Sequence, residues 1–291
     1  MRIDARPTFV FVHGGSSNAR AWIPLQNELA LRGHRSYAVD LPGHGDSATG
    51  PAAYHRNDQD RAAALARESS PMDGVTLADN VRHVVGVLRR LAAHGPVVLA
   101  ANSLGGLTLT AVVNAAPDLV HRAVYLSALC LADPAMLTEP WDVVDESLLD
   151  AAVARIAVPC EAPGTDPGVV RLDWRRAHGD PETFAVLKAA IMADAPDPLF
   201  RQFLDSLDAD ENHGVMEPAA VIRPEAWRRV PHTYVRLAAD HSLTPAVQDH
   251  MIRAADALTP DHPFDVHTLP TSHVGYVSRP ELFADLLTRL S

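Results

Sequence analysis

The sequence predicts an α/β fold, with a mostly parallel, doubly wound sheet that carries helices on both faces and a helical cap. Two observations predict it. Short apolar, β-branched runs alternate with amphipathic helical patterns, and one long segment interrupts this alternation. The predicted strands are residues 9–12, 36–39, 97–101, 123–126, 233–237 and 264–269.

Two helical patterns separate the early strands. Residues 21–31 end before Gly33, and residues 76–93 end before Gly95, where glycine is the common residue after a helix. Thr76 is a candidate N-cap for the second helix. The segment 49–74 before it is rich in Ala, Arg and Asp, and we expect it to be an exposed excursion.

The segment 133–229 is predicted to be the cap. It contains many prolines and no convincing buried strand, and it falls where a helical insertion would cover the carboxyl ends of the strands. Residues 1–132 and 230–291 then form the core. Trp141, Trp174 and His178 are candidates for lining a substrate cleft, the alternative being that the tryptophans form the core of the cap.

The charge composition argues against two classes of function. With 25 basic and 36 acidic side chains among 291 residues, the formal charge of −11 repels phosphate backbones and anionic lipids. We therefore expect a small-molecule substrate and neither a nucleic-acid nor a membrane partner. The sequence leaves open whether the chain forms a homodimer.

The two cysteines, Cys130 and Cys160, lie in no metal-binding spacing and indicate no disulfide framework. The first residues show no apolar stretch of signal-peptide length, and no apolar run reaches the roughly 20 residues of a bilayer span. We expect a cytoplasmic protein.

Ser103 is the strongest candidate for chemistry. It lies in Ala-Asn-Ser-Leu-Gly, between the buried run 97–100 and a helical stretch beginning at Gly106. A strand-to-helix turn with small neighbours can hold a serine hydroxyl exposed as a nucleophile. An ordinary loop is the alternative interpretation.

A nucleophilic serine needs a base and an acid that orients it. Asp240 follows the strand 233–237, and His273 follows the strand 264–269, so both emerge at the same edge of the sheet as Ser103. They are the predicted acid and base. Asp133 is the competing acid, and His241 and His250 are the nearest rival bases.

The first strand ends in His-Gly-Gly-Ser at residues 13–16. The glycines would let the Gly15 N–H approach a substrate. Together with the N–H of Leu104, which lies at a helix start, the Gly15 N–H would bind a developing oxyanion. His13 is expected to shape this loop. The run 208–214 superficially suggests a calcium loop, but its glycine is one place late and Ala219 occupies the position of the bidentate glutamate, so we predict a polar loop.

These motifs together resemble the α/β-hydrolase fold family, and within it the branch of plant-type methylesterases, hydroxynitrile lyases and bacterial serine esterases. The resemblance rests on residues 9–15, 38–45, 99–106 and 240–245 leading to His273, and it spans nearly the whole core. It implies an α/β-hydrolase fold with a serine-based site that requires neither metal nor cofactor.

The chain departs from this branch at two places. Hydroxynitrile lyases have a threonine after the oxyanion-loop histidine and a lysine after the catalytic histidine, whereas this chain has Gly14 and Val274. It therefore resembles the hydrolytic members. Asn102 stands where a histidine is usual, so it would redirect hydrogen bonding beside Ser103, and we include Gly14 and Asn102 among the candidate substrate contacts.

The leading hypothesis is a serine hydrolase that cleaves a carboxylic ester, such as a methyl ester or lactone, of a bulky apolar molecule through Ser103, His273 and Asp240. The alternative is a lyase, cyclase or ring-opening enzyme in which His273 is acid or base and Ser103 only hydrogen-bonds. A ligand-binding pseudoenzyme is the third hypothesis.

Overall fold

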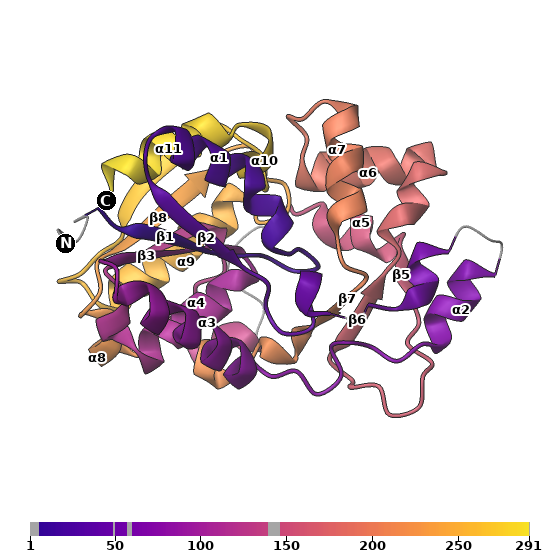
Figure 1. The fold of residues 1–291 in the computed structure, drawn as a ribbon, viewed down its shortest axis with the longest axis horizontal. Coiled ribbons are helices and arrows are strands. Elements are labelled where there is room, and N and C mark those ends of the chain that lie inside the picture. The colour runs from indigo at the N-terminus through magenta and orange to yellow at the C-terminus, as the bar shows by residue number, and fades with distance from the viewer. Residues whose placement is uncertain (1–5, 49, 57–59, 139–145, 291) are drawn as a thin grey trace.

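A six-stranded sheet forms the core, in the order β2-β1-β3-β4-β8-β9, and every neighbouring pair in it is parallel. The computed structural model describes residues 6–48, 50–56, 60–138 and 146–290 (Figure 1). The six predicted strands are confirmed, with ends that agree within about two residues. Their bounds are β1 Thr8–Val12, β2 Arg35–Val39, β3 Val97–Ser103, β4 Arg122–Ala128, β8 His232–Leu237 and β9 Asp265–Leu269.

Side chains alternate between the two faces of this sheet, as the pleat requires. Phe9 and Phe11 point to one face, which is covered by α1 (Ile23–Leu31), α10 (Gly275–Ser278) and α11 (Pro280–Arg289). Val10 and Val12 point to the other, which is covered by α3 (Leu77–Ala92), α4 (Gly105–Ala115), α8 (Pro224–Trp227) and α9 (Pro245–Leu258). The central strands are buried on both sides, which explains their continuous apolar sequence.

The predicted N-cap of the second helix is also confirmed. Thr76 caps α3: its hydroxyl oxygen accepts from the Asp79 N–H at 3.3 Å, and the Asp79 carboxylate accepts from the Thr76 N–H at 3.1 Å. This reciprocal capping box satisfies two backbone donors that a helix start leaves unpaired.

A second layer of structure lies beside the sheet (Figure 1). It contains α5 (Leu149–Ala154), α6 (Pro181–Ile191), α7 (Asp197–Ser206) and a small antiparallel sheet of β5 (Ala157–Val158), β6 (Val169–Leu172) and β7 (Asp210–Asn212). The expectation that 133–229 holds no buried strand is therefore wrong. These strands have two to four residues, and buried positions on them carry Arg171 and Asp210, so no apolar alternation reveals them.

The segment 49–74 is not simply an exposed excursion. It contains α2 (Arg61–Arg67), whose Leu65 is fully buried, and the Ala66 carbonyl accepts from the Glu161 N–H at 2.7 Å. The Arg61 guanidinium binds both oxygens of Asp173 at 2.7 Å. This stretch thus packs against the cap, whereas Ile222 and Trp227, near the end of the predicted cap, pack against the sheet.

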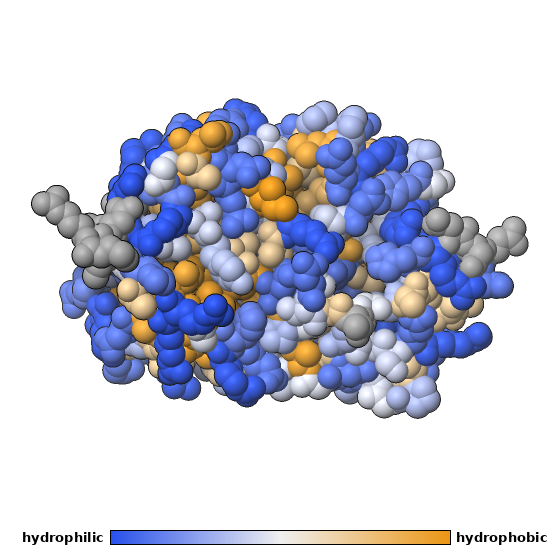
Figure 2. All heavy atoms as spheres, viewed as in Figure 1, coloured by the Kyte–Doolittle hydropathy of each residue, from blue (hydrophilic) through white to orange (hydrophobic). Residues whose placement is uncertain are grey.

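The division into a core of 1–132 and 230–291 and a cap of 133–229 stays a prediction. The contacts of 49–74 with the cap, and of the end of the cap with the sheet, cross its boundaries. On the face shown in Figure 2, hydrophilic side chains predominate, and smaller hydrophobic areas appear near the middle of the view. None of the helices in the described ranges combines the length and apolar character needed to cross a membrane.

Candidate active site

Ser103 ends β3 in a left-handed backbone conformation, with φ of 54°. The two glycines that follow the turn are packed closely against neighbouring backbone. A Cβ added to Gly105 would lie 2.3 Å from the carbonyl oxygen of His13, and one added to Gly106 would lie 2.2 Å from that of Leu129. The glycines let α4 start directly behind the serine, and the strained turn leaves Ser103 on the wall of a cavity.

Asp240 and His273 meet at the carboxyl edge of the sheet. The Nδ1 of His273 lies 2.6 Å from Oδ2 of Asp240, and both side chains are buried. Oδ2 also accepts from the Ser127 hydroxyl at 2.6 Å. Oδ1 accepts from the Ser242 and Leu243 N–H groups at 2.7 and 2.9 Å. Asp240 is thus fixed by donors on both oxygens, and His273 lines the same cavity as Ser103.

The rival residues lie elsewhere. Asp133 is exposed, and its carboxylate accepts from the Ala135 N–H at 2.8 Å as a local helix cap. His241 is exposed in the turn after Asp240, and His250 lies on α9. Of the described carboxylates, Asp240 is the one that pairs with His273.

The two predicted oxyanion donors lie close together. A Cβ built on Gly15 would be 3.6 Å from Cδ2 of Leu104, and one built on Gly14 would be 2.8 Å from Cβ of Ser103. Within the described ranges, neither the Gly15 N–H nor the Leu104 N–H donates to a protein acceptor. Leu104 also precedes the first turn of α4, where the helix dipole favours negative charge.

His13 shapes the oxyanion loop from behind. Its Nε2 accepts from the Leu41 N–H at 3.1 Å, so its Nδ1 carries the proton and donates to the Gly14 carbonyl at 2.9 Å. Burial, reinforced by the neighbouring His44, lowers the pKa of His13 to about 4. His13 is therefore neutral at pH 7.

Glu211 is a cavity residue that the sequence analysis did not identify. It lies on β7, and its Oε2 accepts from the Ser16 N–H at 2.9 Å and lies 3.1 Å from Nε2 of His44. Oε1 accepts from the Asn212 N–H at 2.9 Å. Burial opposes its ionisation, but His44 and these donors outweigh burial and lower the pKa of Glu211 to about 2. The same pairing raises the pKa of His44 against its burial.

The prediction of a polar loop at 208–214 is therefore wrong in one respect, because β7 within it is buried. Two of its carboxylates are bound by other parts of the protein. Asp208 accepts from the Gly45 N–H at 2.9 Å, and Asp210 accepts from Nε and Nη2 of Arg171 at 2.7 and 2.6 Å. In the part of the chain that the structure describes, no three His, Cys, Asp or Glu side chains gather as a metal site.

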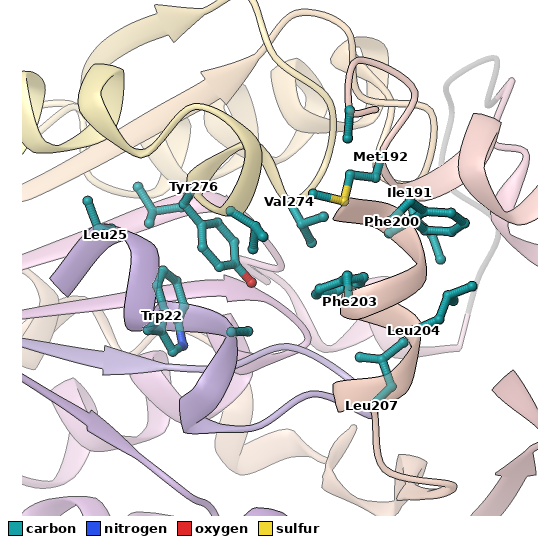
Figure 3. Close-up of a cluster of buried hydrophobic side chains, with 14 of the residues drawn as sticks. Trp22, Leu25, Ile191, Met192, Phe200, Phe203, Leu204, Leu207, Val274 and Tyr276 are labelled. Atoms are coloured by element: carbon teal, nitrogen blue, oxygen red, sulfur yellow. The ribbon is translucent and has the colours of Figure 1, made fainter. Parts of the chain in front are cut away.

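The cavity beside Ser103 has a volume of about 370 Å³ and reaches from the sheet edge into the cap. Much of its wall is apolar. Val274 and Tyr276 of the core line the cavity, and Figure 3 shows them across from Phe203 and Leu207 of the α7 region, which line it too. Trp22 lies outside the lining and stacks on Tyr276, with ring centroids 4.0 Å apart. A bulky apolar group fits such a wall.

The tentative substrate contacts have different outcomes. Trp174 lines the cavity, and its indole N–H donates to the Asp208 carbonyl at 3.1 Å. His178 does not line it, because its ring is on the outside of the cap, 2.7 Å from Oδ1 of Asp205. Trp141 lies outside the described residues. Gly14 lies on the cavity wall.

Asn102 also borders the cavity, but its amide is engaged with the protein. Its Nδ2 donates to the Leu126 carbonyl at 2.8 Å and to the His273 carbonyl at 3.3 Å, while Oδ1 accepts from the Tyr276 hydroxyl at 3.3 Å. Asn102 therefore ties the backbone beside Ser103 to the loop that carries His273.

Comparison with known proteins agrees with this architecture. Residues 9–286 match the family described as "Alpha/beta hydrolase family". Methylesterase 17 of Arabidopsis thaliana is 23% identical over 290 residues, which cover 97% of this chain and 91% of that protein. Esterase Rv0045c of Mycobacterium tuberculosis is 37% identical over 118 residues, covering 40% of this chain and 32% of that protein.

A solved structure of a pyrethroid hydrolase from Sphingobium faniae JZ-2 superimposes with a TM-score of 0.70 and 21% identity, covering 98% of this chain and 96% of that chain. The resemblance to plant methylesterases and bacterial esterases is confirmed by these relatives. Because the family match extends over nearly the whole sequence, and the sheet is parallel with helices on both faces, the chain belongs to the alpha/beta hydrolase family of enzymes.

Proposed function

We propose that the protein is a serine hydrolase that cleaves a carboxylic ester of a bulky apolar small molecule, with methyl esters and lactones as the first candidates. One observation carries the proposal: a serine on a strained turn and a buried His273–Asp240 pair border one largely apolar cavity. The names of the relatives, methylesterases and esterases, agree with this reaction class.

In the proposed reaction, Oγ of Ser103 attacks the ester carbonyl carbon while Nε2 of His273 takes the hydroxyl proton. Asp240 holds the imidazole in the tautomer whose Nδ1 carries the other proton. The N–H groups of Gly15 and Leu104 bind the oxyanion of the tetrahedral intermediate.

The carbon–oxygen bond to the alcohol then breaks, and His273 returns the proton to the leaving alcohol. Water, deprotonated by His273, attacks the acyl-serine and releases the acid, so no oxidant or cofactor enters the balance.

Hydrolysis of p-nitrophenyl butyrate tests the proposal. We expect turnover by the wild-type protein and a loss of about 10³-fold or more in Ser103→Ala. Ser69→Ala, which changes an exposed serine, is the matched control and should behave as wild type.

Two other results decide between the alternatives. If Ser103→Ala retains turnover, Ser103 only hydrogen-bonds and the acyl-enzyme mechanism is wrong; loss of that turnover in His273→Ala would leave His273 as the acid or base. If the wild-type protein binds small esters without cleaving any of them, the chain is a pseudoenzyme.

A further inference from the structure

The polar side chains of the cavity are unevenly distributed. The apolar wall comes from the cap and from Val274 and Tyr276, whereas Ser16, Ser17 and Glu211 lie together on the side of the oxyanion loop. Among the described residues that line the cavity, none is a lysine or arginine, and the two carboxylates are Glu211 and Asp150. The electrostatic surroundings therefore disfavour an anionic group on a ligand.

Ser17 has a hydroxyl that the protein leaves unused. Its side chain lines the cavity and is only 5% exposed, yet within the described part of the chain Oγ has no hydrogen-bond partner. Buried hydroxyl groups are nearly always paired, because an unpaired one loses its hydrogen bonds to water without replacement. A ligand group that reaches Ser17 would restore that bond.

Glu211 has acceptor capacity to spare beside it. A carboxylate has about four acceptor positions, and three of them are taken by the Ser16 and Asn212 N–H groups and by His44. The remaining position is on Oε1. Because the carboxylate is ionised, a bond to it is stronger than one between neutral groups.

These two groups lie near the reacting carbonyl. A Cβ built on Gly15 would be 3.6 Å from Oε2 of Glu211, and Oε1, which has the open acceptor position, is bonded to the same carboxyl carbon. Ser17 is two residues beyond Gly15, so their Cα atoms are at most about 7 Å apart. A substrate whose carbonyl oxygen lies at the Gly15 N–H would therefore reach both groups with a substituent a few bonds away.

We propose that Ser17 and Glu211 form a polar subsite that selects esters carrying a hydrogen-bond donor, a hydroxyl or amino group, on an otherwise apolar and non-anionic skeleton. This inference rests on the proposed esterase function. Glu211 accepts from the substrate donor, and the Ser17 hydroxyl forms its missing hydrogen bond with the same substituent.

A series of matched methyl esters tests the subsite: methyl 3-phenylpropanoate, its 2-hydroxy, 3-hydroxy and 3-amino derivatives, and its 3-carboxy derivative. The readout is the ratio of kcat/KM for each derivative to that for the unsubstituted ester. We expect a ratio of roughly ten or more for the best donor ester and well below one for the carboxylate.

Ser17→Ala should lower the donor ratio by roughly threefold or more, and Glu211→Gln should also relieve the discrimination against the carboxylate ester. Ser36→Ala, a serine on edge strand β2 outside the cavity, is the matched control and should keep the wild-type ratios. Thermal melts confirm that each variant is folded.

The two proposals fail in different ways. If the wild type hydrolyses the unsubstituted ester but the donor ratio is near one, or if Ser17→Ala leaves a high ratio unchanged, the subsite is wrong and the esterase function stands. If no ester in the series or p-nitrophenyl butyrate is cleaved, the proposed function itself is wrong.

Discussion

Replacing Asp240 by asparagine probes the orientation of His273 most sharply. Oδ1 of Asp240 accepts from two backbone N–H groups, those of Ser242 and Leu243, which cannot adapt to a donor. The amide oxygen of the introduced asparagine must therefore occupy the Oδ1 position, and its NH₂ group faces Nδ1 of His273, 2.6 Å away in the native pair. His273 then accepts at Nδ1 and carries its proton on Nε2.

In that tautomer, His273 cannot take the proton of Ser103. We expect a loss of about 10⁴-fold in kcat, the size of the effect when a triad aspartate becomes asparagine in a serine protease, or about 5.5 kcal/mol of barrier. The assay is p-nitrophenyl butyrate hydrolysis, with circular dichroism melts to confirm folding. Asp133→Asn changes the exposed rival acid and should stay within about twofold of wild type.

The reasoning is refuted if folded Asp240→Asn keeps its activity within about tenfold of wild type. If activity instead falls in Asp133→Asn, the acid has been assigned to the wrong residue.

Three further predictions follow from individual contacts. Ser127→Ala removes one donor from Oδ2 of Asp240 and should lower kcat by about two- to tenfold in steady-state kinetics; an unchanged kcat would show that the hydroxyl does not help to hold the acid. Gly105→Ala should lower the free energy of unfolding by about 1–3 kcal/mol, and with it Tm, because the new Cβ meets the His13 carbonyl. The control Gly86→Ala, in open space on α3, should be neutral or stabilising. Equal Tm values for the two variants would contradict this packing. The lowered pKa of Glu211 means that its ionised carboxylate stabilises the fold above pH 4.5, and this stabilisation is lost as pH falls towards 2. Glu211→Gln should therefore be destabilised by about 3 kcal/mol at pH 7 in urea titrations, and its stability should converge on that of wild type near pH 2. A stability difference that does not change with pH would exclude this ionisation.

The elements that could be predicted from the sequence are those whose signals are local. Strands buried on both faces read as apolar runs, and the turn at Ser103 depends on small neighbours that are adjacent in the chain. The loops that bring Asp240 and His273 together follow parallel strands, so their common edge follows from topology.

The cap could not be predicted in the same way, because its burial depends on distant partners. Arg171 is fully buried because Asp210 neutralises it and the carbonyls of Leu65 and Glu68 accept from its Nη1. Glu211 is buried because the Ser16 N–H, 195 positions earlier in the chain, and His44 pair with it. From the sequence alone, charged residues in a short segment predict an exposed loop. The same lack of local signal led to the cleft assignment of His178, whose ring pairs with Asp205 on the outside.

The central claim is that Ser103 is a covalent nucleophile, and its most direct test is reaction with a fluorophosphonate followed by intact-protein and peptide mass spectrometry. The account predicts one adduct, on the peptide that contains Ser103, formed in step with the loss of esterase activity and strongly slowed in His273→Ala. A protein that cleaves esters yet remains unlabelled at Ser103, or loses activity through an adduct elsewhere, would contradict it.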